Sequence, residues 1–182
     1  ELDLMIDICF KHGVKVIADE IHCELIMPGN QYTPFASISE ACRDNCVVLN
    51  SPSKSFNIAG LQIANIICPD AALRRRINRA ININEVCDVN PFGPVALQAA
   101  YNDSEDWLDS LNNYIWANYN YLRDYFHGQV PQLGVTRLEG TYLVWVDISA
   151  TGLSSDVVAD KLLHDGHVLV NAGTTYRQKK GS

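Results

Sequence analysis

The chain has 182 residues, 47% hydrophobic and 19% charged, which is the composition of a globular protein with a sizeable core. Its formal net charge of −7 argues against nucleic acid or an anionic membrane as the main partner. No apolar run approaches the roughly 20 residues of a membrane-spanning helix, and the opening Glu1-Leu2-Asp3 lacks the basic region of a secretory signal, so we expect a cytoplasmic protein.

The first 68 residues alternate helical and strand-like patterns. We expect, in chain order, a helix over 4–12 that ends at Gly13, a strand over 14–18, a helix over 35–42, and strands over 46–49 and 62–68. The strands at 14–18 and 46–49 are almost continuously apolar, which is typical of a parallel sheet covered on both faces. This layout predicts an open α/β sheet, in which ligands bind beyond the carboxyl ends of the strands.

Helical patterns dominate the middle of the chain, over 70–84, 91–101 and 104–128. The first of these helices is basic, and its arginine run is interpreted as a solvated or interface face rather than an anion site. The third carries an apolar and aromatic stripe that we interpret as core or interdomain packing. The stripe consists of Trp107, Leu108, Leu111, Tyr114, Ile115, Leu122, Tyr125 and Phe126.

The last third again reads as α/β. Strand patterns over 135–139 and 142–148 flank Gly140-Thr141, which suggests a hairpin. Ser154 is placed to cap a helix that ends at Gly166, and a strand is expected over 167–170. We therefore predict a partial large domain over 1–100 with a mainly parallel sheet, and over 101–182 a connector helix with a small, incomplete α/β domain.

The six cysteines, at positions 9, 23, 42, 46, 68 and 87, include no CxxC pair. A disulfide scaffold is not expected in a chain this long and apolar. His22, Cys23, Cys42 and Cys46 could imitate a zinc set, but their spacing matches no standard pattern. We predict buried reduced thiols and no metal.

Lys54 is the most informative residue for function. It lies in a loop directly after an apolar strand, among Ser51, Ser53 and Ser55. Lysines are usually surface charges, but hydroxyl groups and loop N–H groups are natural donors to a phosphate. A lysine beside such donors can hold the aldehyde of pyridoxal phosphate (PLP) as an imine.

Two further side chains follow the strand at 14–18. Asp19 closes that strand, where a carboxylate needs a partner, and a protonated pyridine nitrogen is one candidate. An Asp that caps the next turn or pairs with an arginine is the alternative. His22 can face the same ligand and donate to its ring oxygen, although a lone histidine is often structural. Glu20 is interpreted as a solvated or packing residue.

Three ordered segments resemble a known family: residues 18–25 (ADEIHCEL), 51–62 (SPSKSFNIAGLQ) and 140–147 (GTYLVWVD). They are similar to the MalY/PatB-type cystathionine β-lyases, a branch of the fold-type I PLP enzymes within the class I/II aminotransferase superfamily. The resemblance implies the α/β PLP-dependent transferase-like fold. It also implies a homodimer, because that family builds its sites across a dimer interface.

The resemblance also assigns roles to individual residues. It implies that Lys54 attaches PLP and then moves the Cα proton of the substrate, and that Asp19 binds the pyridine nitrogen. His22 would stand near the ring oxygen, in place of a tyrosine in many aminotransferases. The phosphate would be bound by Ser51, with Ser53 as a second candidate. The substrate side of the site would include Tyr142.

The chain also departs from the family pattern. Many aminotransferases have a phosphate-binding arginine eight positions after the lysine, where this chain has Gln62. The N-terminal phosphate-binding turn and ring-stacking aromatic residue are not found, nor is the C-terminal arginine for the substrate carboxylate. We therefore expect a part of a longer enzyme, without its N-terminal part and C-terminal end.

The expected activity is a PLP-dependent carbon–sulfur β-lyase that acts on cystathionine or cysteine conjugates. A class I/II aminotransferase on the same scaffold is the first alternative, and Gln62 favours the lyase. An inactive piece that serves as a dimerisation or binding module is the alternative of another class, since several expected ligands are not found.

Overall fold

The structure, a computed structural model, describes residues 2–176 and divides into two compact units. Unit 1 comprises the chain up to Ala117 together with Glu139–Tyr142, and unit 2 comprises Asn118–Leu138 and the chain from Leu143 onward. The division falls inside the long helix α5 (Glu105–Gln129). Within residues 2–176, no helix combines the length and apolar character needed to span a membrane.

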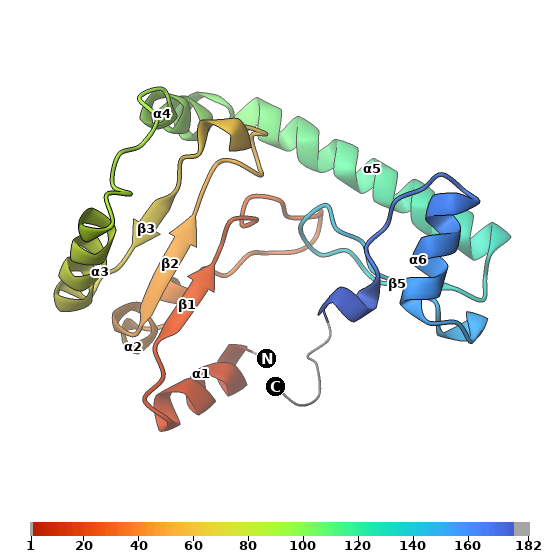
Figure 1. The fold of residues 1–182 in the computed structure, drawn as a ribbon, viewed down its shortest axis with the longest axis horizontal. Helices are drawn as coiled ribbons and strands as arrows, with labels where there is room; N and C mark the ends of the chain where they lie inside the picture. The colour runs from red at the N-terminus through yellow and green to blue at the C-terminus, as the bar shows by residue number, and fades with distance from the viewer. Residues whose placement is uncertain (1, 177–182) are drawn as a thin grey trace. The chain divides into compact units, whose positions relative to one another are not determined.

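Unit 1 carries most of the regular structure (Figure 1). Before α5 its elements are α1 (Leu2–Lys11), β1 (Val16–Asp19), a 3₁₀ helix (Phe35–Ser37), α2 (Glu40–Asp44), β2 (Cys46–Asn50), a 3₁₀ helix (Ala59–Leu61), β3 (Asn65–Ile67), α3 (Ala71–Ile83) and α4 (Gly93–Asp103). One predicted element is wrong in detail, because the helix expected over 35–42 is two short helices. The Ser39 hydroxyl accepts from the backbone N–H of Cys42 at 3.1 Å and starts α2 as a new helix.

The sheet of unit 1 has the strand order β1-β2-β3. β1 and β2 are parallel, with Val16 opposite Cys46 and Asp19 opposite Leu49. β2 and β3 are antiparallel, with Asn50 opposite Asn65. The expectation of a mainly parallel sheet is therefore wrong for the described strands, which form one parallel and one antiparallel pairing. The link from β2 to β3, residues 51–64, contains only a short 3₁₀ helix and no α-helix that could cross a face of the sheet, which agrees with an antiparallel pairing.

The core of unit 1 lies against one face of this sheet. Ile6 of α1, Phe35, Cys42 of α2 and the β2 residues Cys46 and Val48 form a buried cluster. Alternate residues of β1 pack against the same cluster. Ile17 points to the opposite face and is 70% exposed, so the expectation that β1 is buried on both faces is wrong.

The helices α3 and α5 show how far a hydrophobic pattern predicts burial. Asp70 caps α3 by accepting from the N–H groups of Ala72 and Leu73, and the helix spans the predicted range. Leu108 and the other aliphatic members of the α5 stripe are half-buried. The expectation of packing is wrong for the three aromatic residues of the stripe that are at least half exposed, namely Trp107, Tyr114 and Tyr125.

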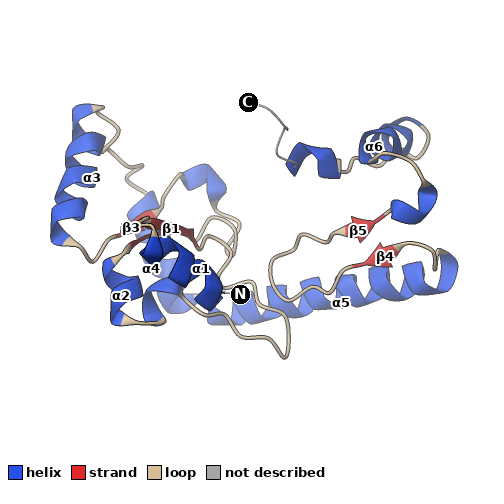
Figure 2. Ribbon diagram, turned by 90° about the horizontal axis from the view of Figure 1, so that it is seen from below, coloured by secondary structure: helices blue, strands red, loops and turns tan. Residues whose placement is uncertain are grey.

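Unit 2 contains a short antiparallel pair, β4 (Gly134–Val135) and β5 (Val146–Asp147), followed by a 3₁₀ helix (Ser149–Thr151), α6 (Ser155–His164) and a 3₁₀ helix (Gly173–Tyr176). Figure 2 shows the two strands side by side. The predicted cap of α6 is confirmed, since the Ser154 hydroxyl accepts from the N–H of Val157. The strand expected over 167–170 is wrong. His167 has a positive φ of 55°, and the N–H of Val168 donates back to the Leu162 carbonyl, which turns the chain at the end of α6.

Candidate active site

Asp19 and the Ser51–Ser55 loop leave the sheet at the same edge. Asp19 is the last residue of β1 and lies opposite Leu49 of β2. Ser51 follows Leu49 by two positions in the chain. Because β1 and β2 are parallel, their carboxyl ends meet at one edge (Figure 1). The Asp19 carboxylate is exposed and accepts from the backbone N–H of Ile21 at 3.3 Å. It therefore closes the next turn and still presents oxygen atoms to solvent.

The two serines predicted to hold a phosphate also bond to their own loop. Ser51 is buried, and its Oγ lies 2.6 Å from the carbonyl oxygen of Ile63 and 2.9 Å from Ser53 Oγ. A hydroxyl carries one proton and a carbonyl can only accept, so Ser51 donates to Ile63. Ser51 Oγ also accepts from the backbone N–H of Ser53 at 3.1 Å. The loop is thus internally bonded, and Ser53 is the more accessible of the two serines.

Lys54 projects from a turn whose other residues are largely buried. The N–H of Phe56 donates to the carbonyl of Pro52 at 2.9 Å and closes the turn. Pro52 and Ser55 are fully buried, whereas Lys54 is exposed. Among residues 2–176 its ammonium group has neither a hydrogen-bond nor an ion-pair partner. Such an amine is accessible to an incoming carbonyl group.

His22 and Tyr142 lie together although 120 residues separate them in the chain. Their rings meet edge to face, with centroids 5.3 Å apart and an interplanar angle of 73°. Residues 139–141 run antiparallel to residues 25–27, with the N–H of Thr141 donating to the Leu25 carbonyl at 2.7 Å and that of Met27 donating to the Glu139 carbonyl at 3.0 Å. This pairing brings Tyr142 back to the segment that follows His22.

The His22 ring also carries a polar atom with no partner. Its Nδ1 atom is buried and has no hydrogen bond within the described part of the chain. Buried polar atoms are almost always paired, and an orphaned one indicates a missing partner such as a water or a ligand. The edge of the sheet thus offers an exposed amine, an exposed carboxylate and an unpaired imidazole nitrogen.

A polar network beside the Lys54 loop was not predicted from the sequence. Ser55 Oγ donates to Glu24 Oε2 at 2.7 Å. Tyr101 of α4 donates to Asn50 Oδ1 at 2.6 Å, and Asn50 Nδ2 donates to Cys23 Sγ at 3.2 Å. Burial and the nearby Glu24 charge raise the pKa of the Cys23 thiol to about 12, and the same two causes raise the pKa of Tyr101. Only the position of Glu24 inside the 18–25 motif could have signalled this network.

Glu20 has a structural role that agrees with its interpretation as a packing residue. Its Oε1 atom accepts from the backbone N–H of Phe35 at 2.9 Å. The pKa of the Tyr32 phenol is raised by burial and by its hydrogen bond to Glu20. Glu20 thereby attaches the loop after residue 30 to the end of β1, next to Asp19.

The sequence profile of the family "Aminotransferase class I and II" matches residues 1–181. The chain belongs to this family. It is 38% identical over 170 residues to cystathionine beta-lyase PatB of Bacillus subtilis (strain 168), covering 93% of this chain and 44% of PatB. It is 29% identical over 180 residues to protein MalY of Escherichia coli (strain K12), covering 98% of this chain and 45% of MalY.

A solved structure shares the fold. Cystalysin from Treponema denticola, which contains a pyridoxal 5'-phosphate cofactor, matches with a TM-score of 0.90 and 31% identity, over 94% of this chain and 43% of cystalysin. The predicted fold class, α/β of the PLP-dependent transferase type, and the resemblance to the MalY/PatB branch are confirmed. The chain spans less than half the length of each of these proteins.

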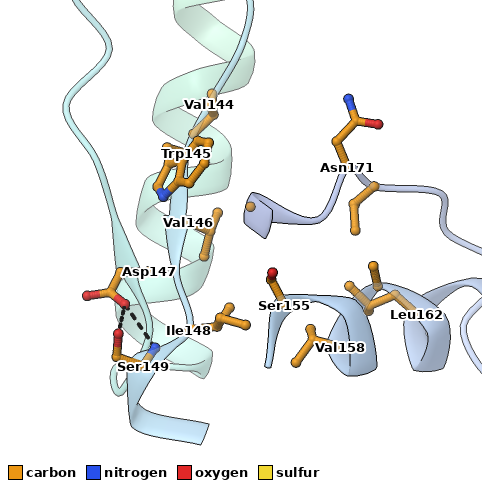
Figure 3. Close-up of a pocket in the computed structure, with 13 residues that line it drawn as sticks. Val144, Trp145, Val146, Asp147, Ile148, Ser149, Ser155, Val158, Leu162 and Asn171 are labelled. Carbon is orange, nitrogen blue, oxygen red and sulfur yellow. Dashed lines mark hydrogen bonds between the residues drawn. The ribbon is translucent and has the colours of Figure 1, made fainter. Parts of the chain in front are cut away.

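A cavity of about 300 Å³ in unit 2 is separate from the predicted site residues. It lies between β5, α6 and residues 170–173, and Val146 and Ile148 point into it toward α6 (Figure 3). Asp147 points away from it and accepts from the N–H and hydroxyl of Ser149, which lower the pKa of its carboxyl. The lining is mainly aliphatic, and none of Asp19, His22, Ser51, Ser53, Lys54 and Tyr142 contributes to it.

Proposed function

We propose that the intact protein is a PLP-dependent carbon–sulfur β-lyase. It would break the Cβ–S bond of an L-amino acid such as cystathionine or a cysteine conjugate and release the sulfur as a thiol, and water would convert the remaining three-carbon fragment to pyruvate and ammonia. The observation that carries the proposal is Lys54, an exposed amine without a partner in residues 2–176. It lies beyond the carboxyl edge of a sheet in a chain 38% identical to a cystathionine β-lyase.

The residues at this edge fit PLP. The orphaned Nδ1 atom of His22 calls for a polar partner, which an oxygen substituent of the pyridine ring would supply. Lys54 would attach the cofactor and carry the proton taken from Cα of the substrate. Asp19 would hold the pyridine nitrogen in its protonated form. Bound PLP supplies an electron sink for the charge that develops at Cα.

The remaining assignments concern Ser53, Ser51 and Tyr142. Ser53 is favoured over Ser51 as a phosphate donor, because Ser51 is buried and donates to a carbonyl, whereas Ser53 is more accessible and its contact is with the Ser51 hydroxyl. Tyr142 is 44% exposed beside His22, which supports a position on the substrate side. Ser51 would then act through the loop, by holding the backbone of Ser53.

An aminotransferase on the same scaffold is the second candidate, since the matching family includes that activity by name. Gln62 favours the lyase. It is exposed and ends the 3₁₀ helix at Leu61 with a positive φ of 50°, and it offers no positive charge to a phosphate. An aminotransferase would return the proton to the cofactor and would need a keto-acid acceptor for turnover.

The two candidates are separated by incubating the intact protein with PLP and cystathionine. Release of pyruvate without any added keto acid supports the lyase and excludes a strict transaminase. Turnover that requires an added keto acid and releases no pyruvate would support the aminotransferase instead. Lys54→Ala is expected to remove both the visible absorbance of the bound cofactor and the activity, and a protein without absorbance or turnover would be the binding module instead.

We also propose that the intact protein is a homodimer. Support comes from large apolar side chains that unit 1 exposes before and within α4, including Phe92 at 72% and Val95 at 68%. Apolar side chains in such number are typical of a covered surface. Sedimentation of the intact protein as a monomer at micromolar concentration would contradict this proposal.

A further inference from the structure

Ser55, the residue after Lys54, is tied to the loop that carries Asp19 and His22. Its hydroxyl is fully buried and donates to Glu24 Oε2 at 2.7 Å. Glu24 follows His22 by two positions, so this bond connects the two loops of the candidate site directly. We call this hydrogen bond the Ser55–Glu24 clamp.

Helix α5 holds both sides of the clamp through their backbones. The indole Nε1 of Trp107 donates to the Ser55 carbonyl at 3.3 Å, and Asn112 Nδ2 donates to the Glu24 carbonyl at 3.0 Å. The two donors lie in the first half of α5, inside unit 1. A helix is a stiff support, so the two loops are fixed to one common element as well as to each other.

A second link runs parallel to the clamp. Asn50, the last residue of β2, donates to Cys23 Sγ at 3.2 Å and accepts from Tyr101 at 2.6 Å. This link joins the same two loops one step closer to the sheet. The end of β2 is thereby fixed, and the clamp acts on the part of the loop that lies beyond it.

We propose that Ser55 and Glu24 are positioning residues that hold the Lys54 amine at the carboxyl edge of the sheet. The inference rests on the proposed function. Lys54 itself makes no hydrogen bond or ion pair with any described residue, so its location is set by the backbone on either side. On one side that backbone is held by the buried Pro52 and Ser51, and on the other by the buried Ser55. Without the clamp the second side keeps only the Trp107 hydrogen bond to the Ser55 carbonyl, so the loop should loosen and move the amine without unfolding the sheet.

The test measures where PLP attaches. The intact protein is treated with PLP and borohydride, and the rate at which Lys54 becomes labelled is followed by mass spectrometry. Ser55→Ala is compared with wild type and with Ser37→Ala, whose hydroxyl donates to the Pro34 carbonyl at the surface, outside the site. Labelling of Lys54 is expected to fall about tenfold in Ser55→Ala, the effect of losing one hydrogen bond to a charged group, and to stay unchanged in Ser37→Ala.

Glu24 variants distinguish positioning from general stability. Glu24→Ala is expected to slow labelling like Ser55→Ala, and the double variant is expected to show no further loss, because both changes break the same bond. Glu24→Gln keeps an acceptor oxygen and is expected to recover most of the labelling rate. Hydrogen exchange is expected to speed up at the amides of residues 54–56 in Ser55→Ala and Glu24→Ala, with thermal unfolding close to that of Ser37→Ala.

The outcomes separate the two proposals. Wild-type protein that is not labelled at Lys54 overturns the proposed function, and the positioning role with it. Wild-type labelling at Lys54 together with an equal rate and equal amide exchange in Ser55→Ala overturns the positioning role alone. Slower labelling that Glu24→Gln fails to recover, with a matching loss of thermal stability, also overturns it, because the bond would then be structural.

Discussion

Gly140 packs directly against the carbonyl oxygen of Leu25. A Cβ atom at position 140 would lie 3.0 Å from that oxygen and 3.3 Å from Ile26 Cδ1. The close approach allows the hydrogen bonds that pair residues 139–141 with residues 25–27, and Leu25 is itself fully buried. The glycine therefore permits the contact that brings Tyr142 to His22.

Gly140→Ala is expected to destabilise the protein by about 1–3 kcal/mol, because the added methyl group meets backbone that cannot move without breaking the pairing. Gly128→Ala is the control. Gly128 lies in α5, where an added Cβ would meet no atom within 4 Å apart from its own chain neighbours and helix backbone, and alanine there is expected to stabilise by roughly 0.5–1 kcal/mol. Urea unfolding measures both, and equal midpoints for the two variants would contradict the packing argument.

The Cys23 thiol is expected to react slowly with alkylating reagents. Burial and Glu24 raise its pKa from 9.0 to about 12, so at pH 8 it holds roughly a thousandfold less thiolate than an unperturbed thiol. Iodoacetamide labelling followed by mass spectrometry should modify the exposed Cys87 first. Glu24→Gln removes one cause of the shift and should speed the labelling of Cys23 alone. Faster labelling of Cys23 than of Cys87 in wild type would refute the shift.

The same shift predicts a loss of stability in alkali. The pKa of Cys23 is higher in the folded state than in the unfolded state, so the unfolded thiol releases its proton first as the pH rises. The stabilisation of the folded state by the protonated Cys23 thiol is fully present below about pH 9 and is lost between pH 9 and 12. Urea unfolding over that range should show a shallower decline in Cys23→Ala than in wild type, and parallel curves would contradict the assignment.

The order of elements could be predicted from the sequence because it depends on local signals. Periodicity located α1, α3 and α5, and Ser154 marked the start of α6 correctly. Pairing direction and burial depend on distant segments instead. The antiparallel β3 and the exposed face of β1 were missed for that reason. The apolar run at 167–170 has strand composition, but it turns back on α6.

The residues of the candidate site also fall into two groups, those that a local segment of sequence indicates and those that depend on distant segments. Lys54, Asp19 and His22 could be proposed as site residues because each stands in a short segment whose composition indicates its chemistry. Trp107 and Asn112 could not, since their hydrogen bonds reach back 52 and 88 positions in the chain. Helical periodicity assigned Trp107 to packing, whereas its side chain is 52% exposed and its indole N–H holds the Lys54 loop.

Glu20→Ala is expected to lower the free energy of unfolding by about 1–3 kcal/mol, since it leaves the partly buried N–H of Phe35 without its acceptor. The change should also lower the pKa of Tyr32 toward its ordinary value, because a hydrogen bond to Glu20 and its charge are causes of the rise. Ultraviolet titration of the phenols, with Tyr32→Phe to assign the signal, measures the second effect. A Tyr32 pKa that stays as high in Glu20→Ala would contradict the contribution of Glu20.

His22→Phe is expected to separate stability from cofactor binding. Phenylalanine keeps a ring against Tyr142 and removes the buried Nδ1 atom that has no partner in the described chain. Removing an unsatisfied polar atom saves its desolvation penalty, so the protein without PLP should be as stable as wild type or up to about 1–3 kcal/mol more stable. PLP binding should weaken, because the ring loses the nitrogen proposed to face the cofactor.

Tyr142→Phe, which keeps the ring contact and loses only a hydroxyl, is the matched control and should bind PLP like wild type in the absence of substrate. Chemical unfolding of the PLP-free protein and absorbance titration with PLP measure the two quantities. Lower stability of His22→Phe with unchanged PLP affinity would show that Nδ1 serves the fold and not the cofactor.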